Sequence, residues 1–157
     1  MKNEDSMSKA KLVYNQLKAA LDKKNWKYNA VEEDLVIVSD YIGDDFPIQF
    51  LFRVDEKREC LSFHTSEFAT FEKKDYLDGA LAVSVANHGM VFGHFDFNIA
   101  KGTICYSMSN SFVGADLSED FFLAMLATAV STVDHYNDRF IMLSKGLIDF
   151  QKFVSLE

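Results

Sequence analysis

Strict alternation of apolar and polar residues between Gly93 and Met108 constrains the fold more than any other feature of this sequence. The apolar positions are Phe95, Phe97, Ile99, Ile104, Tyr106 and Met108, and the polar positions between them are His94, Asp96, Asn98, Thr103, Cys105 and Ser107. Side chains two residues apart lie on the same face of a β-strand. The short link at 100–102 contains a glycine, which favours a tight turn. The segment therefore predicts a β-hairpin in an antiparallel sheet that is covered on one face only.

The composition is that of one globular domain spanning residues 1–157. Hydrophobic residues make up 48% of the chain and aromatic residues 14%, which is enough for a core without disulfides or metal. The single proline and seven glycines form no linker-like stretch.

The charge balance is acidic, with 24 Asp and Glu residues against 16 Lys and Arg residues and a net charge of −8. This balance argues against nucleic acid and against anionic membrane as partners. Residues 1–11 are polar and charged, and no apolar run reaches the ~18 residues of a membrane helix. We therefore expect a cytoplasmic protein, in which Cys60 and Cys105 are reduced thiols.

The apolar periodicity predicts the order α-β-β-β-β-α-β-β-α, which is a two-layer α+β fold. A helix is expected over 7–24, capped by Ser6 or Ser8 and closed by Asn25. A short edge strand follows from Trp26 and Tyr28. The remaining expected elements are strands at 35–41, 46–54 and 60–65 with a turn at 43–45, a helix at 75–87 whose apolar stripe is Leu77, Ala80, Leu81 and Val85, and the hairpin. The sheet then has five to six antiparallel strands, with the helices on one face.

The last segment begins at Ser118, a helix cap, and carries apolar residues at alternating spacings of four and three. These residues are Phe122, Leu126, Ala129, Val133, Tyr136, Phe140, Leu143, Leu147, Phe150 and Val154. One unbroken helix would be ~55 Å long, whereas a six-stranded sheet is only ~25–30 Å wide. Either the helix breaks near Gly146 and folds back, or its far end packs on another chain. From about residue 146 the sequence therefore predicts a C-terminal helical extension.

Several of these landmarks together resemble the YbjN family, which is described as bacterial sensory-transduction regulators with a fold similar to that of type III secretion chaperones. The resemblance runs loosely from about residue 10 to 145. It is carried by the leading helix with Asn25-Trp26-Lys27-Tyr28, by Leu81–Asn87, by Phe92–Phe97, and by Gly102 with the strand after it. The resemblance implies no catalytic residue, and the tail after Gly146 is longer than the family pattern.

Two groups of residues are candidates for a site. Strand alternation places Arg53, His64, His94 and Asp96 on the polar face of the sheet, where the histidines could bind a ligand or metal. The alternative is a solvated sheet face, which the lack of a defining metal spacing favours. The second group is the far end of the heptad pattern, Phe140, Leu143, Leu147, Phe150 and Val154, which either packs on its own chain or forms a protein interface. The first half of that pattern, from Phe122 to Tyr136, is expected to seal the core.

No serine lies in a nucleophile elbow, and no glycine cluster matches a phosphate-binding loop. The sequence therefore favours a non-enzymatic protein-interaction domain without a cofactor, a homodimeric regulator or chaperone-like adaptor. The rival hypothesis is a small-ligand or metal-binding domain that uses the polar face of the sheet.

Overall fold

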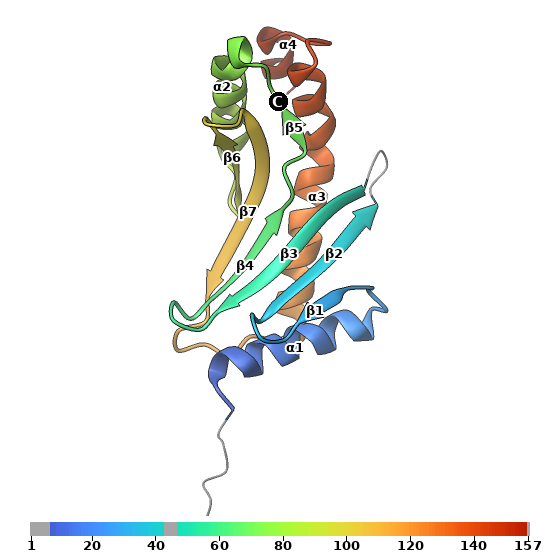
Figure 1. Cartoon of the computed structure of the whole chain (residues 1–157), viewed down its shortest axis with the longest axis vertical. Helices are drawn as coiled ribbons and strands as arrows, with labels where there is room; N and C mark the ends of the chain where they lie inside the picture. Colours follow the sequence, from blue (N-terminus) through green and yellow to red (C-terminus); the bar gives the residue numbers. More distant parts are fainter. Residues whose placement is uncertain (1–6, 43–46, 157) are drawn as a thin grey trace, which may run out of the picture.

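The computed structural model describes residues 7–42 and 47–156, which form an antiparallel sheet with helices packed against one face. Figure 1 shows α3 running the length of the molecule behind the sheet, with α1 crossing one end and α2 and α4 at the other end. The helices are α1 (Lys9–Lys23), η1 (Lys73–Asp75), α2 (Tyr76–Asn87), α3 (Glu119–Ser144) and α4 (Phe150–Val154). The strands are β1 (Asn29–Val31), β2 (Val36–Ile42), β3 (Pro47–Asp55), β4 (Cys60–Thr65), β5 (Ala69–Thr70), β6 (His94–Asn98) and β7 (Thr103–Ser111).

Within the described ranges the sheet has seven strands. The sequence predicted five to six, and β5 is the strand that this prediction did not include. Along the sheet the order is β1-β2-β3-β4-β7, every neighbouring pair is antiparallel, and β6 lies on the other side of β7. Strand β5 pairs with the start of β7 on the edge that β4 leaves free. Strand β4 ends at Thr65, before β5 begins at Ala69. The Thr65 side-chain Oγ1 accepts a hydrogen bond of 2.9 Å from the backbone N–H of Tyr106. The α+β class and the helices on one face are confirmed.

The hairpin predicted at 93–108 is formed by β6 and β7, and its two faces differ as expected. Phe95, Ile104 and Tyr106 are buried, while His94 and Asp96 are exposed. Ile99 was placed in the core from its alternation, and this is wrong, because its side chain is 67% exposed. The Oδ1 atom of Asn98 accepts the N–H groups of residues 100 and 101, which starts the turn one residue earlier than the alternation suggests.

Helices α1 and α2 show how capping and packing set the local structure. Ser8 caps α1 by accepting the N–H of Lys11, and Asn25 ends it with a left-handed φ of 54°. In α2, however, the stripe expected from Leu77, Ala80, Leu81 and Val85 is wrong, because both leucines are exposed. The buried positions of α2 are Gly79, Ala82, Val83 and Ala86. A Cβ on Gly79 would lie 2.6 Å from the Phe97 ring, so the small residues let α2 approach the sheet closely.

Helix α3 ends at Ser144, and the heptad pattern is interrupted at Gly146. Of the two alternatives given for this helix, the structure shows the break near Gly146. Gly146 has a left-handed φ of 66°, its N–H donates to the Leu143 carbonyl, and the N–H of Leu147 donates to the Met142 carbonyl. This pair of bonds is a Schellman motif, which closes a helix and turns the chain away. The chain then folds back, and the ring of Phe153 packs 5.2 Å from that of Phe140.

Some expectations fall outside the described residues: Ser6 as an alternative cap, the turn at 43–45, and Phe46 as the start of a strand. Trp26 and Tyr28 precede β1 rather than beginning it, and Trp26 packs on Phe50 and donates to the Ser39 hydroxyl at 2.8 Å. Of the helices in the described ranges, none combines the length and the apolar character needed to cross a bilayer.

Candidate functional site

Strand pairing brings a row of polar residues together on the outer face of the sheet, away from the helices. His64 of β4 and His94 of β6 both pair with Ser107 of β7. Asp96, two residues after His94, lies on the same face and pairs with Cys105. The structure therefore places His64, His94 and Asp96 side by side around Ser107, although 29 residues (65–93) separate the two histidines along the chain.

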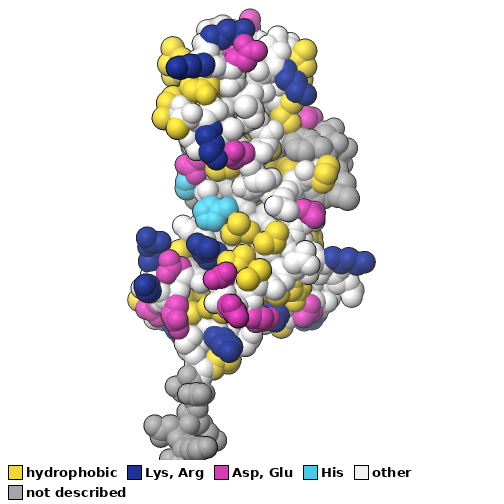
Figure 2. All heavy atoms as spheres, viewed as in Figure 1, with side chains coloured by type: hydrophobic (Ala, Val, Ile, Leu, Met, Phe, Trp, Pro, Cys, Tyr) yellow, Lys and Arg dark blue, Asp and Glu magenta, His cyan; other side chains and the backbone are white. Residues whose placement is uncertain are grey.

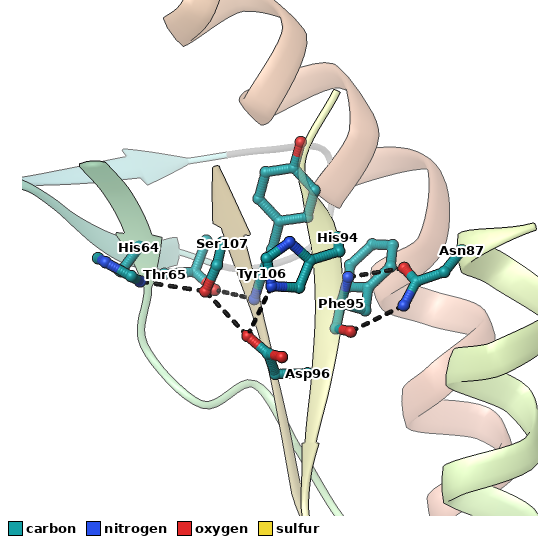
Figure 3. A network of polar contacts seen from close by, with 8 residues as sticks. All are labelled: His64, Thr65, Asn87, His94, Phe95, Asp96, Tyr106 and Ser107. Atoms are coloured by element: carbon teal, nitrogen blue, oxygen red, sulfur yellow. Dashed lines mark hydrogen bonds and ion pairs between the residues drawn. The ribbon is translucent and has the colours of Figure 1, made fainter. Parts of the chain in front are cut away.

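Hydrogen bonds connect this row, as Figure 3 shows. The Ser107 hydroxyl donates to Asp96 Oδ2 at 3.1 Å, and His64 Nδ1 lies 3.0 Å from the same hydroxyl oxygen. His94 Nε2 lies 3.3 Å from Asp96 Oδ2. Because the hydroxyl proton goes to Asp96, Nδ1 of His64 is the donor to Ser107.

The surroundings of His64 and Cys105 on this face favour the neutral imidazole and the neutral thiol. Burial lowers the pKa of His64, the neighbouring Arg53 and His94 side chains lower it further, and Asp96 opposes them. Burial also raises the pKa of the Cys105 thiol, and the negative charges of Asp96 and Glu67 add to that effect. A thiol with a raised pKa is a weak nucleophile at neutral pH.

The hydrogen-bond order of His64, Ser107 and Asp96 differs from that of a catalytic triad with an activated serine. In a catalytic triad the histidine accepts the serine proton, and the carboxylate stands behind the histidine. Here Ser107 lies between His64 and Asp96 and gives its proton to the carboxylate, and its side chain is buried. Among the described residues, no three His, Cys, Asp or Glu side chains are grouped so that they could hold a metal. What the arrangement does is join β4, β7 and β6 by side-chain hydrogen bonds.

Other contacts hold the row from the core side. The amide of Asn87, the last residue of α2, makes two bonds to the Phe95 backbone, donating to its carbonyl at 2.9 Å and accepting its N–H at 2.8 Å. Figure 3 shows this pair of bonds between α2 and β6. The remaining candidate, Arg53, pairs with Ser62 one strand further away and is exposed.

The polar row continues into an apolar area on the same face. By register, Val38 of β2 pairs with Leu51 of β3, and Leu51 pairs with His64, and both apolar side chains are partly buried. Figure 2 views this face and shows hydrophobic side chains gathered next to a histidine, with charged side chains around them.

The five residues proposed from the heptad pattern do not share one environment. Phe140 and Leu143 are buried in the chain's own core, so they offer no exposed surface. Leu147 is 69% and Val154 39% exposed, and Phe150 is partly buried. The buried residue of α4 is Phe153, which the pattern did not include.

Sequence reasoning missed a second apolar surface, which lies on α3 and faces away from the sheet. The helix has no charged residue from Phe121 to Val133, although Ala124, Ala127 and Ser131 are exposed there. A groove lined by Trp26 and Leu123 runs along one side of this stretch, and a groove lined by Phe92 and Phe121 along the other. The uncharged run is visible in the sequence, but the first half of the heptad pattern, from Phe122 to Tyr136, was interpreted only as the face that seals the core.

Comparison with solved structures shows that this fold occurs in protein complexes. A chain of the ExsC-ExsE complex matches with a TM-score of 0.62 and 14% identity, covering 85% of this chain and 97% of its own length. A chain of the HopA1-SchA chaperone-effector complex matches with a TM-score of 0.58 and 12% identity, covering 86% and 98%. The crystal structure of YbjN from E. coli, described as "a putative transcription regulator", matches with a TM-score of 0.58 and 10% identity, covering 85% and 92%.

At these identities the structures establish the shared fold, and the sequence itself establishes the family. No curated protein sequence matches the chain. The model of the YbjN family, described as "Putative bacterial sensory transduction regulator", matches residues 14–142, from the middle of α1 almost to the end of α3. This match includes every strand and the whole polar row, and the chain therefore belongs to the YbjN family.

Proposed function

We propose that this chain is a non-enzymatic, cytoplasmic protein-interaction domain that acts as a regulator or chaperone-like adaptor. The observation that carries the proposal is the exposure of large apolar side chains on helices rather than only in loops. Leu77 and Leu81 on α2 and Val154 on α4 are all exposed. Exposed apolar surface on a folded domain is typical of a protein partner site. The family and the two protein complexes of the same fold support this proposal.

Purification from the native cell tests the proposal directly. Tagged protein is isolated, bound proteins are identified by mass spectrometry, and each is then made separately and titrated against the purified chain by calorimetry. We expect at least one partner that rebinds with a defined stoichiometry. If no identified protein rebinds, the proposal fails.

We also propose that the chain forms a homodimer through its C-terminal end, where Leu147 and Val154 are exposed. Light scattering should then give twice the mass of the single chain, and Leu147→Glu with Val154→Glu should give a monomer, because two charges would be buried at the contact. Val113→Glu is the matched control, since Val113 is 62% exposed but lies in the loop between β7 and α3. If the wild type is a monomer, the dimer proposal is contradicted, whereas the proposal that the chain binds other proteins is unaffected.

The juxtaposition of His64, His94 and Asp96 supports a second candidate function, the binding of a small ligand on the outer face of the sheet. Thermal melting with a metabolite panel tests it, and the same measurement with zinc and nickel tests the metal binding predicted from the sequence. A shift that disappears in the variant His64→Ala with His94→Ala would support this function. The absence of any shift in the wild type would exclude it for those ligands.

A further inference from the structure

The first half of α3 exposes a face that differs from the rest of the acidic surface. Its inward positions, such as Phe122 and Ala129, are buried against the sheet, and its outward positions are Ala124, Ala127 and Ser131. A helix on the surface of a soluble domain normally carries charged residues on its outer face, and a helix that is apolar all round is normally covered. In the second half of α3 the charges return with Asp134 and Asp138. The uncharged face is therefore confined to residues 121–133.

Two grooves flank this face and share the helix as a wall. The first, the Trp26 groove, encloses about 410 Å³ and is lined by Lys24, Trp26, Leu123, Leu126, Ala127 and Val130. The second, the Phe92 groove, is lined by Phe92, Met108, Asn110, Phe121, Ala124, Met125 and Thr128. Because Ala127 lines one and Ala124 the other, the grooves and the helix between them form one continuous surface.

The walls of the two grooves indicate the conformation of what binds there. The Phe92 groove includes Met108 and Asn110 of β7, which lie beyond the residues that pair with β6. The Trp26 groove is lined by α3 together with Lys24 and Trp26, and none of these lining residues lies in a strand. An extended peptide would leave its own N–H and C=O groups without partners on such a surface, whereas a helix satisfies them internally. The stretch from Phe121 to Ser131 is about 15 Å long, which matches about three turns of a partner helix.

The charge at the rim indicates which sequence the partner helix carries. Lys24 lines the Trp26 groove, and the side chain of Lys27, the residue after Trp26 in the chain, is exposed. Neither forms an ion pair with another residue in the described ranges, whereas Lys23 pairs with Glu119 and Lys18 with Glu32. Two unpaired cations beside an apolar groove, on a chain with a net charge of −8, favour an acidic ligand at this place.

We propose that the outer face of α3 at residues 121–131, with the Trp26 and Phe92 grooves, binds an amphipathic helix of a partner protein whose apolar stripe is flanked by acidic residues. This inference rests on the proposed protein-binding function and specifies the partner's chemistry. The acidic residues of the partner lie toward Lys24 and Lys27, and away from Asp120, which is exposed one turn before Ala124.

Trp26 gives a direct readout, because it is the only tryptophan in the chain and it lines the groove. The probe is a tryptophan-free helical peptide of about 14 residues, with leucines at i, i+3, i+4, i+7 and glutamates beside them. A second peptide has the same leucines and lysines in place of the glutamates. We expect the acidic peptide to shift the Trp26 emission and to bind about tenfold more tightly than the basic peptide at low salt. Equal affinity of the two peptides, or no change in emission, would overturn the proposal.

Matched variants separate this face from the rest of the surface. Ala127→Glu should weaken the acidic peptide about tenfold, because it places a charge in the groove. Ala19→Glu makes the same change at an exposed position of α1 and should have no effect. Lys24→Glu should remove the preference for the acidic peptide, and Lys57→Glu, an exposed lysine in the β3–β4 turn, should leave it unchanged. Melting curves of the four variants show that each is folded.

Two further outcomes distinguish this site from the proposed function and from self-association. If a partner from the native cell binds Ala127→Glu as tightly as the wild type, the α3 site is wrong and the protein-binding function stands. If light scattering shows a wild-type dimer that Ala127→Glu converts to a monomer, the occupant is a second copy, and the acidic-helix proposal is overturned.

Discussion

Gly93 lies at the start of β6 with a left-handed φ of 71°, directly against the buried ring of Tyr106. A Cβ at this position would be 2.1 Å from the Tyr106 hydroxyl oxygen, which donates a 2.8 Å hydrogen bond to the Phe92 carbonyl. The glycine therefore serves both the turn and the close approach of β6 to β7.

We predict that Gly93→Ala lowers the free energy of unfolding by about 2 to 5 kcal/mol, from backbone strain plus a clash in the core. Gly114→Ala is the control, since Gly114 has a similar φ of 66° but has no atom within 4 Å of the added Cβ. Its cost should be about 1 kcal/mol from the backbone alone. Urea unfolding measures both, and equal losses would contradict the close packing described here.

His64 couples the outer face of the sheet to pH. Its pKa is lowered from 6.5 in the folded chain, chiefly by burial, so below pH 6.5 the unfolded chain takes up a proton more readily than the folded chain does. Stability therefore falls as the pH drops through about 6.5 toward the folded-state pKa, and no further loss from this group occurs below it.

We predict that His64→Gln flattens the stability curve over this pH window, while His88→Gln, at an exposed position after α2, leaves its shape unchanged. Thermal melting between pH 7.5 and pH 5 is the measurement. The prediction fails if the wild type and His64→Gln lose stability in parallel.

At the scale of elements, the end of α3 shows why a heptad pattern cannot be extended through a helix break. The pattern continued through Val154, but after Gly146 the chain leaves the helix and α4 begins anew at Phe150. A new helix has its own phase, and in α4 that phase turns Phe153 inward and Val154 outward. Phe153 packs on Phe140, whose ring also contacts Phe95 and Phe68.

We therefore predict that Phe153→Ala costs about 3 to 5 kcal/mol of unfolding free energy, as expected for a buried aromatic residue. Val154→Ala, one residue away on the exposed side, should cost less than about 0.5 kcal/mol. Denaturant unfolding of the two variants compares them. A small effect of Phe153→Ala would mean that α4 does not dock on α3 in solution.

At the scale of the whole molecule, strand pairing separates the two cysteines. Cys60 of β4 pairs with Ser111 at the end of β7, whereas Cys105 lies in β7 itself, near its start, and pairs with Asp96. Six residues of strand span about 20 Å, which is far beyond the reach of a disulfide.

We predict that mass spectrometry under non-reducing conditions finds both thiols free and that a reductant leaves the melting temperature unchanged. The Cys60→Ser and Cys105→Ser variants should behave alike in this test. A disulfide within the chain would contradict the strand order.

What the sequence determined by itself is local: the faces of each strand, the caps at Ser8 and Ser118, and the stop at Gly146. These follow from the alternation of side chains along a strand and from backbone preferences within a few residues. The same alternation placed His64, His94 and Asp96 on one face, and that part of the candidate site was predictable.

Only the tertiary structure decided which strands are neighbours and which surfaces stay uncovered. Alternation gives the side of a strand on which a residue lies, but not the strand beside it, so nothing local brings His64 and His94 to Ser107. Likewise the same heptad pattern describes Phe140, which other elements bury, and Leu147, which they leave exposed. The two grooves beside α3 form where the segment after α1 and the β6–β7 hairpin pack against this helix. The positions of these segments depend on the path of the whole chain.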